Sequence, residues 1–525
     1  MKKTIAFALS LLMAGSLLLG GCGKTTGGKA DNTTIDWLMF SNGPADEDAP
    51  VKQYFEEKFG VKFNLWYIER SKWDDLLSVR FAAGEIPDVF PSMSSSSFRK
   101  YVEQGLIMPL SMETLEKDAP KLVQLVNDYD PDQWKYSTIN GKLYAIPTYN
   151  YANKYHIASV WRDDWLKKVG IDKIPETLDE AETAFYKFRN DDPDGNGQKD
   201  TYGLSDKGVY NSIFGAFGYL PRDMGGTMAM WADRDGKLVY SAVQPEMKEA
   251  LKLLNKWYVD GIIDPEFLAG ENTSGHWSNS QAFVNGRIGY TANGMFYHIA
   301  PPMTADDSGS SFYRDFKKLQ GENATYAVGR PPIGPEGKSG NYKGGTVSSG
   351  GIVFGNQLAD NLEKLKTILN IISEISTDYD LNLISTGGFE GEHFDKKEDG
   401  TIIAREGFKT GAELSKIGAG SIFNMNGLRP IQWYTDEHAQ PISREQYKWA
   451  EEVTNFSGID SKLLVEVESG PKYNTVLDKM RETTYIQIIT GEKPIDYFDE
   501  WVEQWKKNGG EQLEKEANEW YNTVK

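Results

Sequence analysis

Cysteine is nearly absent from this chain of 525 residues, in which Cys22 is the single example. One cysteine cannot form an internal disulfide, and it excludes zinc sites built from several cysteines. Histidine is scarce too, and the five present show no metal-ligand spacing. The sequence also lacks a Gly-x-x-x-x-Gly-Lys-Ser/Thr phosphate loop, so any ATP hydrolysis must come from a partner.

Basic residues are outnumbered, because 57 Lys and Arg stand against 76 Asp and Glu and give a formal net charge of -19. A surface of this sign repels nucleic acid and anionic lipid, so we expect neither as a partner. Aromatic residues are plentiful, with 14 Trp, 27 Tyr and 24 Phe. We expect most of these rings in large cores and some in a sugar site, since sugar C–H faces stack on rings.

Residues 1–21 have the pattern of a signal peptide: Lys2 and Lys3 precede an apolar run that is too short to span a membrane comfortably. The following Leu-Gly-Gly-Cys sequence ends at Cys22 and resembles the bacterial lipobox. That resemblance implies cleavage before Cys22, attachment of a diacylglycerol to its sulfur, and a flexible tether over residues 22–32. The alternative is an ordinary secretory peptide with an incidental cysteine.

Residues 192–200, with the sequence DPDGNGQKD, follow the ligand spacing of a calcium loop. The predicted ligands at loop positions 1, 3, 5, 7 and 9 are Asp192, Asp194, Asn196, Gln198 (through its backbone carbonyl) and Asp200. Position 12 is Gly203, so the bidentate Glu of an EF-hand is missing and no helix pair is implied. The alternative is an Asx-rich turn without metal. We predict a structural calcium ion.

Strands and helices alternate through the first part of the chain. Residues 34–40, 61–68 and 86–90 are predicted strands separated by helical segments, an order that indicates a parallel α/β sheet with ligand loops at the strand carboxyl ends. Residues 149–155 form an aromatic and polar crossover. Thr177 and Glu180 have the spacing of a capping box that opens a helix before the calcium loop.

Several phrases together resemble the family 1 extracellular solute-binding lipoproteins of Gram-positive ABC importers. They are the lipobox, AGEIPD at 83–88, YAIP at 144–147, RDDWL at 162–166, the calcium loop, GIIDPEF at 261–267 and GFEGEH at 388–393. The resemblance implies an α/β fold of two discontinuous lobes, the type II periplasmic-binding-protein clamshell. It places residues 33–150 and 325–388 in the N-terminal lobe, and residues 151–324 and 389–525 in the C-terminal lobe.

The same resemblance implies a function. We expect a monomeric protein, lipid-anchored on the outer face of the cell membrane, that captures an oligosaccharide between its lobes. It would deliver that ligand to ABC permease subunits served by a separate ATPase. Alginate-binding relatives also carry the calcium loop, but they have Glu where Thr201 stands, so Thr201, a backbone oxygen or a water would complete the metal shell.

Ligand contacts are expected on loops where the lobes face each other. The candidates are Asn42, Tyr149, Asn211, Phe214, Trp277, Phe296, Glu390 and Trp433. Resemblance to maltose-type binding proteins suggests that Phe296 is a stacking aromatic. For Trp277 and Trp433 the alternative is simple packing, and for Glu390 it is a solvated loop position.

Two enzyme classes remain as alternatives. SFRK at 97–100, YAN at 151–153 and KTG at 409–411 occur in the order used by serine penicillin-recognising enzymes, but matches this short arise by chance. A glycoside-active enzyme needs two carboxylates flanking the scissile bond, and Glu390 and Glu392 are available. We predict a binding protein rather than an enzyme.

Overall fold

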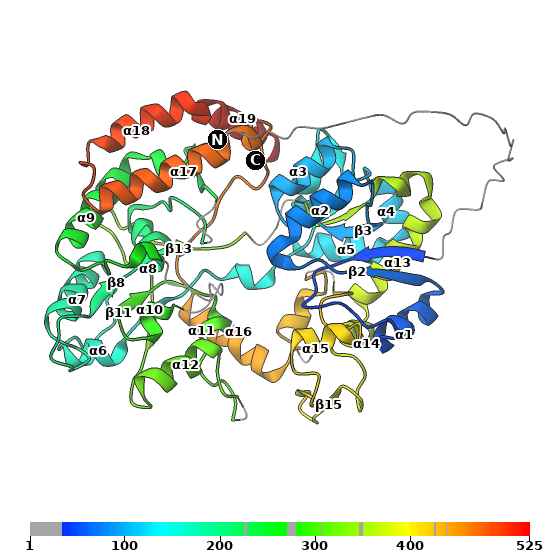
Figure 1. The fold of residues 1–525 in the computed structure, drawn as a ribbon, viewed down its shortest axis with the longest axis horizontal. Coiled ribbons are helices and arrows are strands. Elements are labelled where there is room, and N and C mark those ends of the chain that lie inside the picture. Colours follow the sequence, from blue (N-terminus) through cyan, green and yellow to red (C-terminus); the bar gives the residue numbers. More distant parts are fainter. Residues whose placement is uncertain are drawn as a thin grey trace, which may run out of the picture.

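The computed structural model describes residues 34–224, 228–269, 280–305, 307–345, 350–424, 427–436 and 438–525. These residues form two α/β lobes that lie side by side, each with its own sheet and cores (Figure 1). This arrangement confirms the predicted two-lobed fold. None of the helices in the described ranges is both long and apolar enough to cross a membrane.

The first lobe is built on a five-stranded sheet in the order β2-β1-β3-β14-β6. The strands are β1 (Thr34–Leu38), β2 (Lys62–Trp66), β3 (Val89–Pro91), β6 (Ala145–Ile146) and β14 (Ile352–Phe354). β1 runs parallel to β2 and β3, whereas β14 is antiparallel to β3 and β6. Side chains alternate along β1, so Ile35 and Trp37 enter one core and Leu38 enters the core on the other face.

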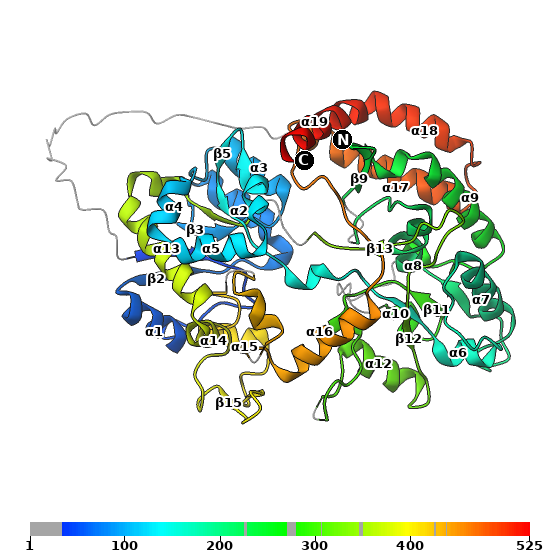
Figure 2. The same cartoon turned by 180° about the vertical axis from the view of Figure 1, so that it is seen from behind.

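Helices cover both faces of this sheet. They are α1 (Pro50–Phe59), α2 (Trp73–Ala82), α3 (Ser95–Glu103), α4 (Met112–Asp118), α5 (Pro120–Tyr129), α13 (Leu362–Thr377) and α14 (Tyr379–Gly387). Figure 2 shows α13 beside α4 and α5, although these helices are far apart in sequence. The short helix α15 (Gly411–Lys416) and the hairpin of β15 (Phe394–Lys396) and β16 (Ile402–Ala404) complete this side.

The second lobe is built on a four-stranded sheet in the order β12-β7-β11-β8. Its strands are β7 (Ser159–Trp161), β8 (Tyr202–Leu204), β11 (Ile288–Thr291) and β12 (Ala327–Gly329). Its earlier helices are α6 (Asp163–Lys168), α7 (Leu178–Asn190), α8 (Asp206–Asn211), α9 (Pro245–Val259), α10 (Gln281–Val284), α11 (Phe296–Ile299) and α12 (Ser311–Gln320). The predicted capping box of Thr177 and Glu180 does open α7.

The C-terminal part of the chain adds four helices to the second lobe: α16 (Pro441–Val453), α17 (Gly470–Ile489), α18 (Tyr497–Trp505) and α19 (Glu511–Val524). α17 packs on α9, and α19 packs on the hairpin of β9 (Trp231–Arg234) and β10 (Lys237–Tyr240). β13 (Asn341–Tyr342) and β17 (Gly458–Ile459) pair as a short parallel ribbon, and β4 (Thr138–Ile139) pairs with β5 (Lys142–Leu143).

Along the described residues the chain passes between the lobes three times: between β6 and β7, between β12 and β14, and before α16. Two predicted lobe boundaries differ from this. β12 pairs with β7, so residues 327–329 belong to the second lobe and not to the first. Ala419, Phe423 and Leu428 are buried in the core of the first lobe, so the third crossing lies after residue 428 rather than at 388. The crossing points are defined by strand pairing and by burial in one core or the other. Local amino-acid composition shows neither, so the sequence did not predict these boundaries correctly.

Candidate functional site

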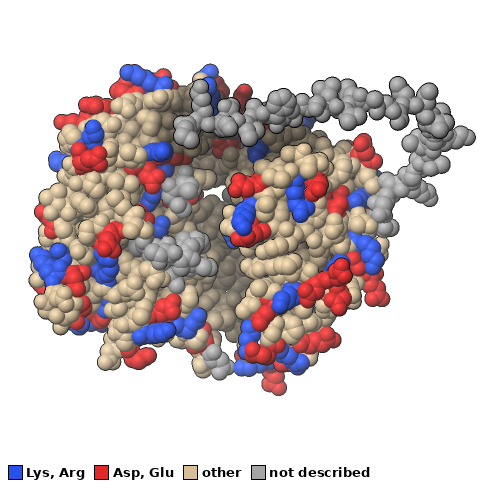
Figure 3. Space-filling model, in the orientation of Figure 1, with Lys and Arg blue, Asp and Glu red and all other residues tan. Residues whose placement is uncertain are grey.

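A cavity of about 530 Å³ lies where the lobes and their crossovers meet. Figure 3 shows the surface hollowed between the two lobes. The lining residues are Phe40, Arg70, Ser92, Met93, Gly427 and Arg429 from the first lobe, Thr148, Tyr149, Asn150, Ala152, Asn153, Gly345 and Tyr434 from the crossovers, and Tyr297 and Tyr447 from the second lobe. Cavities of about 300–1,000 Å³ are usual for small-ligand sites.

The sheet of the first lobe positions one wall. Phe40 lies two residues beyond the end of β1, and Ser92 directly follows β3. Because these strands are parallel neighbours, their carboxyl ends meet at one edge of the sheet, where such folds bind ligands. The opposite wall comes from Tyr297 in α11, which follows β11 of the second sheet, and from Tyr447 in α16.

Tyrosines dominate the cavity. Tyr149 stacks on Tyr129 with ring centroids 4.5 Å apart, and Tyr151 stacks on Tyr434 at 4.7 Å. Tyr447 meets the ring of Tyr151 edge-on at 5.1 Å. Burial raises the pKa of Tyr149 and of Tyr447, so both phenols stay neutral and can donate hydrogen bonds at physiological pH. The rings therefore offer both flat apolar faces and polar edges.

Two guanidinium groups reach the same cavity. Arg70 lies over the ring of Phe40 at 4.7 Å, and Arg429 lies over the ring of Tyr434 at 4.4 Å. The backbone of Arg429 is held by Tyr129, whose hydroxyl accepts from the Arg429 N–H at 3.0 Å. Neither guanidinium forms an ion pair with a described carboxylate, and none of the described lining residues is Asp or Glu.

Of the predicted ligand contacts, Tyr149 lies in this cavity. The predicted ligand contacts at Phe214, Asn211 and Phe296 disagree with the structure, because all three residues are at most 1 % exposed. Phe214 packs against Tyr485 in the second core, and Asn211 donates to the carbonyl of Ala292 at 3.0 Å. Side chains this buried hold the second lobe together and cannot reach a ligand in the cavity.

The remaining candidates lie elsewhere. Asn42 packs against the backbone of Gly411, Glu390 is exposed at the β15 hairpin, and Trp433 packs edge-on against Tyr379 at 5.4 Å. Trp277 and Cys22 lie outside the described residues. The cavity instead takes Tyr297 beside Phe296 and Tyr434 beside Trp433. In both cases the predicted residue precedes the lining residue by one position. The sequence pattern does not show which of two adjacent aromatic side chains faces a cavity.

The predicted calcium loop closes on itself through hydrogen bonds. Asp192 accepts from the backbone N–H groups of Gly195, Asn196 and Gly197. The side-chain amide of Asn196 donates to Asp194 at 2.8 Å and to Asp200 at 3.2 Å. Burial raises the pKa of Asp194, while backbone hydrogen bonds lower that of Asp192. Among the described residues, no group of three or more His, Cys, Asp or Glu side chains has the geometry of a metal site.

The Thr201 hydroxyl donates to the carbonyl of Phe188 at 2.6 Å and the residue is 1 % exposed, so this side chain is not available to complete a metal shell.

The motifs of the serine penicillin-recognising alternative do not come together in the structure. Lys100 donates to Ser78 at 3.2 Å, whereas Ser97 donates to Asp74 at 3.0 Å, so Lys100 does not activate Ser97. Lys409 pairs with Glu406. The motif order is therefore coincidental.

Comparison with known proteins identifies the fold and the family. The lipoprotein LipO of Bacillus subtilis is 25% identical over 100% of this chain and 99% of its own length. The polygalacturonan/rhamnogalacturonan-binding protein YtcQ of the same organism matches at 25% over 100% and 99%. The structure of the FusA substrate-binding protein of S. pneumoniae with kestose covers 94% of this chain and 99% of its own, with TM-score 0.65 and 19% identity. An EF-hand mutant of FusA gives TM-score 0.66.

The family model described as bacterial extracellular solute-binding protein matches residues 51–357, more than half of the chain. Members of this family bind solutes and do not transform them, which agrees with an open cavity of neutral phenols and of guanidinium groups that pair with none of the described carboxylates. The chain therefore belongs to the bacterial extracellular solute-binding protein family, and its interlobe cavity is the site of a binding protein rather than of an enzyme.

Proposed function

We propose that this protein captures an oligosaccharide in the interlobe cavity and delivers it to the permease of an ABC importer powered by a separate ATPase. The observation that carries the proposal is the tyrosine-lined cavity shared by both lobes. Rings stack on sugar C–H faces, and the exposed amide of Asn150 suits sugar hydroxyls. Ser92 and Asn153 donate to the carbonyls of Ser94 at 3.1 Å and Gly345 at 2.7 Å, so they offer a ligand their oxygen atoms as acceptors. Two relatives support a carbohydrate ligand, because YtcQ is a polygalacturonan/rhamnogalacturonan-binding protein and FusA is a fructooligosaccharide-binding protein.

A ligand that contacts both walls of the cavity couples its own binding to closure of the two lobes. Arg429 on the first lobe and Tyr297 and Tyr447 on the second line the same cavity, so one ligand can contact both lobes in this arrangement. A ligand therefore shifts the population toward the closed form by its extra contacts there. The permease could then select loaded from empty protein by the relative position of the lobes.

Calorimetry against a panel of neutral and acidic oligosaccharides tests this function. We expect saturable binding of at least one member, a change in intrinsic Trp fluorescence on closure, and an intact sugar after long incubation. Failure of every oligosaccharide to bind would overturn the proposal, and shortened products would indicate a glycoside-active enzyme.

We further propose that the mature protein is a monomer anchored by lipid at Cys22 on the outer face of the cell membrane. The support is the lipobox-like sequence together with similarity along the full chain to the lipoprotein LipO. The two acyl chains of a diacylglycerol hold a protein stably, whereas one chain holds it only marginally. Cys22→Ser should release the protein to the medium or leave it unprocessed. A processed variant that stays firmly in the membrane fraction would contradict the anchor.

Calcium in the 192–200 loop is also a proposal. The donor set of Asp192, Asp194, Asn196, Asp200 and the Gln198 carbonyl is all oxygen, as calcium requires. Asp194 and Asp200 already share one partner, the amide of Asn196, so a cation in place of that amide hydrogen would meet both carboxylates. The ion would clip the end of α7 to β8 and would supply no chemistry at the cavity.

The effect of a chelator on thermal stability tests whether calcium binds in this loop. An ion that binds only the folded state stabilises it by about 2.7 kcal/mol at a hundredfold excess over Kd. We expect a chelator to lower the Tm of the wild type and to leave Asp194→Ala unchanged, with oligosaccharide affinity retained in both. Equal melting curves with and without chelator would contradict a bound calcium ion.

A further inference from the structure

The charge balance of the cavity is opposite to that of the molecule. The chain carries a formal net charge of -19, yet Arg70 and Arg429 are the charged side chains among the described lining residues. Two ion pairs adjoin lining residues in sequence, Lys154 with Glu451 at 2.6 Å and Lys72 with Glu69 at 3.1 Å, and in each the two charges compensate each other. The described lining residues therefore present two positive charges and no carboxylate, in a protein of net negative charge.

Arg429 is the more confined of the two. It is half-buried, its Nε atom is buried without a hydrogen-bond partner among the described residues, and its guanidinium plane lies on Tyr434. Stacking leaves the edge of the guanidinium fork free, and that edge donates two parallel hydrogen bonds to a carboxylate. An unpaired guanidinium in a confined place lacks favourable solvation, so an anion that completes it gains affinity.

The residues around the two arginines are suited to sugar rings. Tyr149, Tyr297 and Tyr447 supply faces for stacking in the same cavity. Sugars that combine such rings with a planar carboxylate are uronic acids. We infer that the ligand of the interlobe cavity is an acidic oligosaccharide built from uronic acid units, with Arg429 and Arg70 as the groups that recognise its carboxylates. This inference rests on the proposed oligosaccharide-binding function and narrows it to one class of sugar.

Methyl esterification provides the sharpest test, because it removes the charge of a uronate and keeps its rings. We would measure binding of trigalacturonate and trimannuronate, of their fully methyl-esterified forms, and of neutral trisaccharides by calorimetry at low salt. We expect at least one uronate to bind about ten- to a hundredfold more tightly than its ester, the scale of a charge-assisted hydrogen bond. Added NaCl should weaken the acid and leave the ester unchanged.

Variants assign the preference to residues. Arg429→Gln should abolish the preference for acid over ester, while Arg429→Lys should keep part of it, because charge survives and the fork is lost. Arg70→Gln should have a smaller effect, since this side chain is exposed. The matched control is Arg80→Gln on α2, where the guanidinium pairs with Glu85 at 3.3 Å outside the cavity, and it should not change the preference. Unchanged melting curves show that each variant folds.

The outcomes distinguish failure of the uronate preference from failure of oligosaccharide binding. Equal affinity for acid and ester, or binding of neutral trisaccharides alone, would overturn the inference and leave the oligosaccharide-binding function standing. A preference for acid that survives in Arg429→Gln and Arg70→Gln would overturn the assignment to these arginines. Binding of no sugar in any form would overturn the proposed function and this inference together.

Discussion

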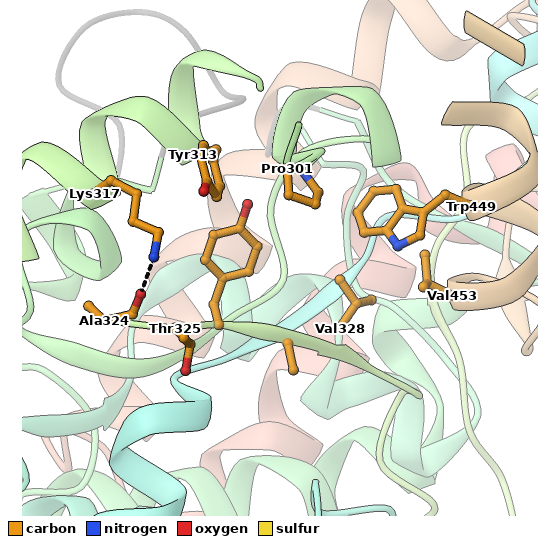
Figure 4. A pocket seen from close by; sticks show the side chains of 10 residues that line it. Pro301, Tyr313, Lys317, Ala324, Thr325, Val328, Trp449 and Val453 are labelled. Atoms are coloured by element: carbon orange, nitrogen blue, oxygen red, sulfur yellow. Dashed lines mark hydrogen bonds between the residues drawn. The ribbon is translucent and has the colours of Figure 1, made fainter. Parts of the chain in front are cut away.

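The interlobe cavity and the pocket in Figure 4 are both concave and aromatic, yet they differ in whether their charged side chains have partners among the described residues. The Figure 4 pocket, of about 360 Å³, lies on the second lobe between α12, β12 and α16. Its Lys317 donates to the carbonyls of Glu322 at 2.7 Å and Ala324 at 2.8 Å, and Tyr326 donates to Ile299 at 2.6 Å. In the interlobe cavity, by contrast, neither guanidinium has a counter-ion among the described residues.

Helix α16 takes part in both regions, since Tyr447 lines the cavity and Trp449 lines the Figure 4 pocket. Cavity volume and apolar lining therefore do not by themselves identify a ligand-binding site. A charged group that is already bonded to backbone carbonyls stabilises the local fold, whereas a charged group without a partner is available to a ligand. The Figure 4 pocket is therefore interpreted as a packing crevice.

The largest expected effect separates two neighbours in α11. Phe296 is 1 % exposed and packs on Tyr155 and Tyr447, so Phe296→Ala should reduce the free energy of unfolding by about 3–5 kcal/mol. Tyr297 is 37% exposed in the cavity, so Tyr297→Ala should leave stability nearly unchanged and weaken oligosaccharide binding. Urea unfolding and calorimetry measure both. The reverse pattern would show that the cavity has been assigned to the wrong ring.

An intermediate effect compares the two aromatic residues of α16. Tyr447→Ala removes a cavity ring and should weaken oligosaccharide binding by about 1–3 kcal/mol, the scale of burying one large side chain. Trp449→Ala is the matched control, two positions along the same helix, and should leave the dissociation constant unchanged. A loss of affinity in Trp449→Ala equal to that in Tyr447→Ala would remove the distinction between the two regions.

The smallest effect concerns a crevice of about 320 Å³ where the lobes also meet, beside α3 and α17. Glu466 accepts from Asn474 at 2.8 Å, and its backbone carbonyl accepts from Arg99 of the first lobe at 2.7 Å. Burial raises the pKa of Glu466 to about 7, with a further upward contribution from Asp478 and a downward one from Arg99. Glu466, Asn474 and Asp478 in its lining all have protein partners, so its charged groups resemble those of the Figure 4 pocket.

A carboxyl whose pKa is higher in the folded than in the unfolded state binds its proton more tightly when folded. Stability from Glu466 is therefore full below the unfolded pKa of 4.5 and is lost as pH rises through about 7. After allowance for its partial exposure, we expect a loss of about 1–2 kcal/mol. Glu466→Gln should flatten this part of the pH dependence in urea unfolding, with oligosaccharide affinity unchanged. An identical pH profile in the variant would contradict the protonated carboxyl.

Local patterns in the sequence predicted local structure well. The capping box at Thr177 and Glu180 opens α7, and the apolar runs before Phe40 and Ser92 form β1 and β3. The parallel order of these strands also indicated the correct edge of the sheet for a site. Tyr149 was found because it lies on a crossover next to a strand, where the path of the chain leaves little choice.

Most of the cavity could not be predicted in this way. Arg429 and Tyr434 stand on a segment with no periodic pattern, and they reach the site because Tyr129, some 300 residues earlier in sequence, holds the Arg429 backbone. Phe214 and Phe296 are aromatic residues in plausible places, but only packing shows that their rings face the core. A pattern of residue types does not distinguish a ring that stacks on a ligand from one that stacks on another ring.

By itself the sequence determined the class of this protein: an acidic α/β chain with a signal peptide pattern, no catalytic motif of specific spacing, and phrases that resemble solute-binding proteins. These features are local or compositional, so they survive without coordinates. Tertiary structure alone decided where the chain crosses between the lobes, which tyrosines line the cavity, and that Arg70 and Arg429 have no ion-pair partner among the described residues. Those properties depend on contacts between residues far apart in sequence, and such contacts form only when both lobes are folded.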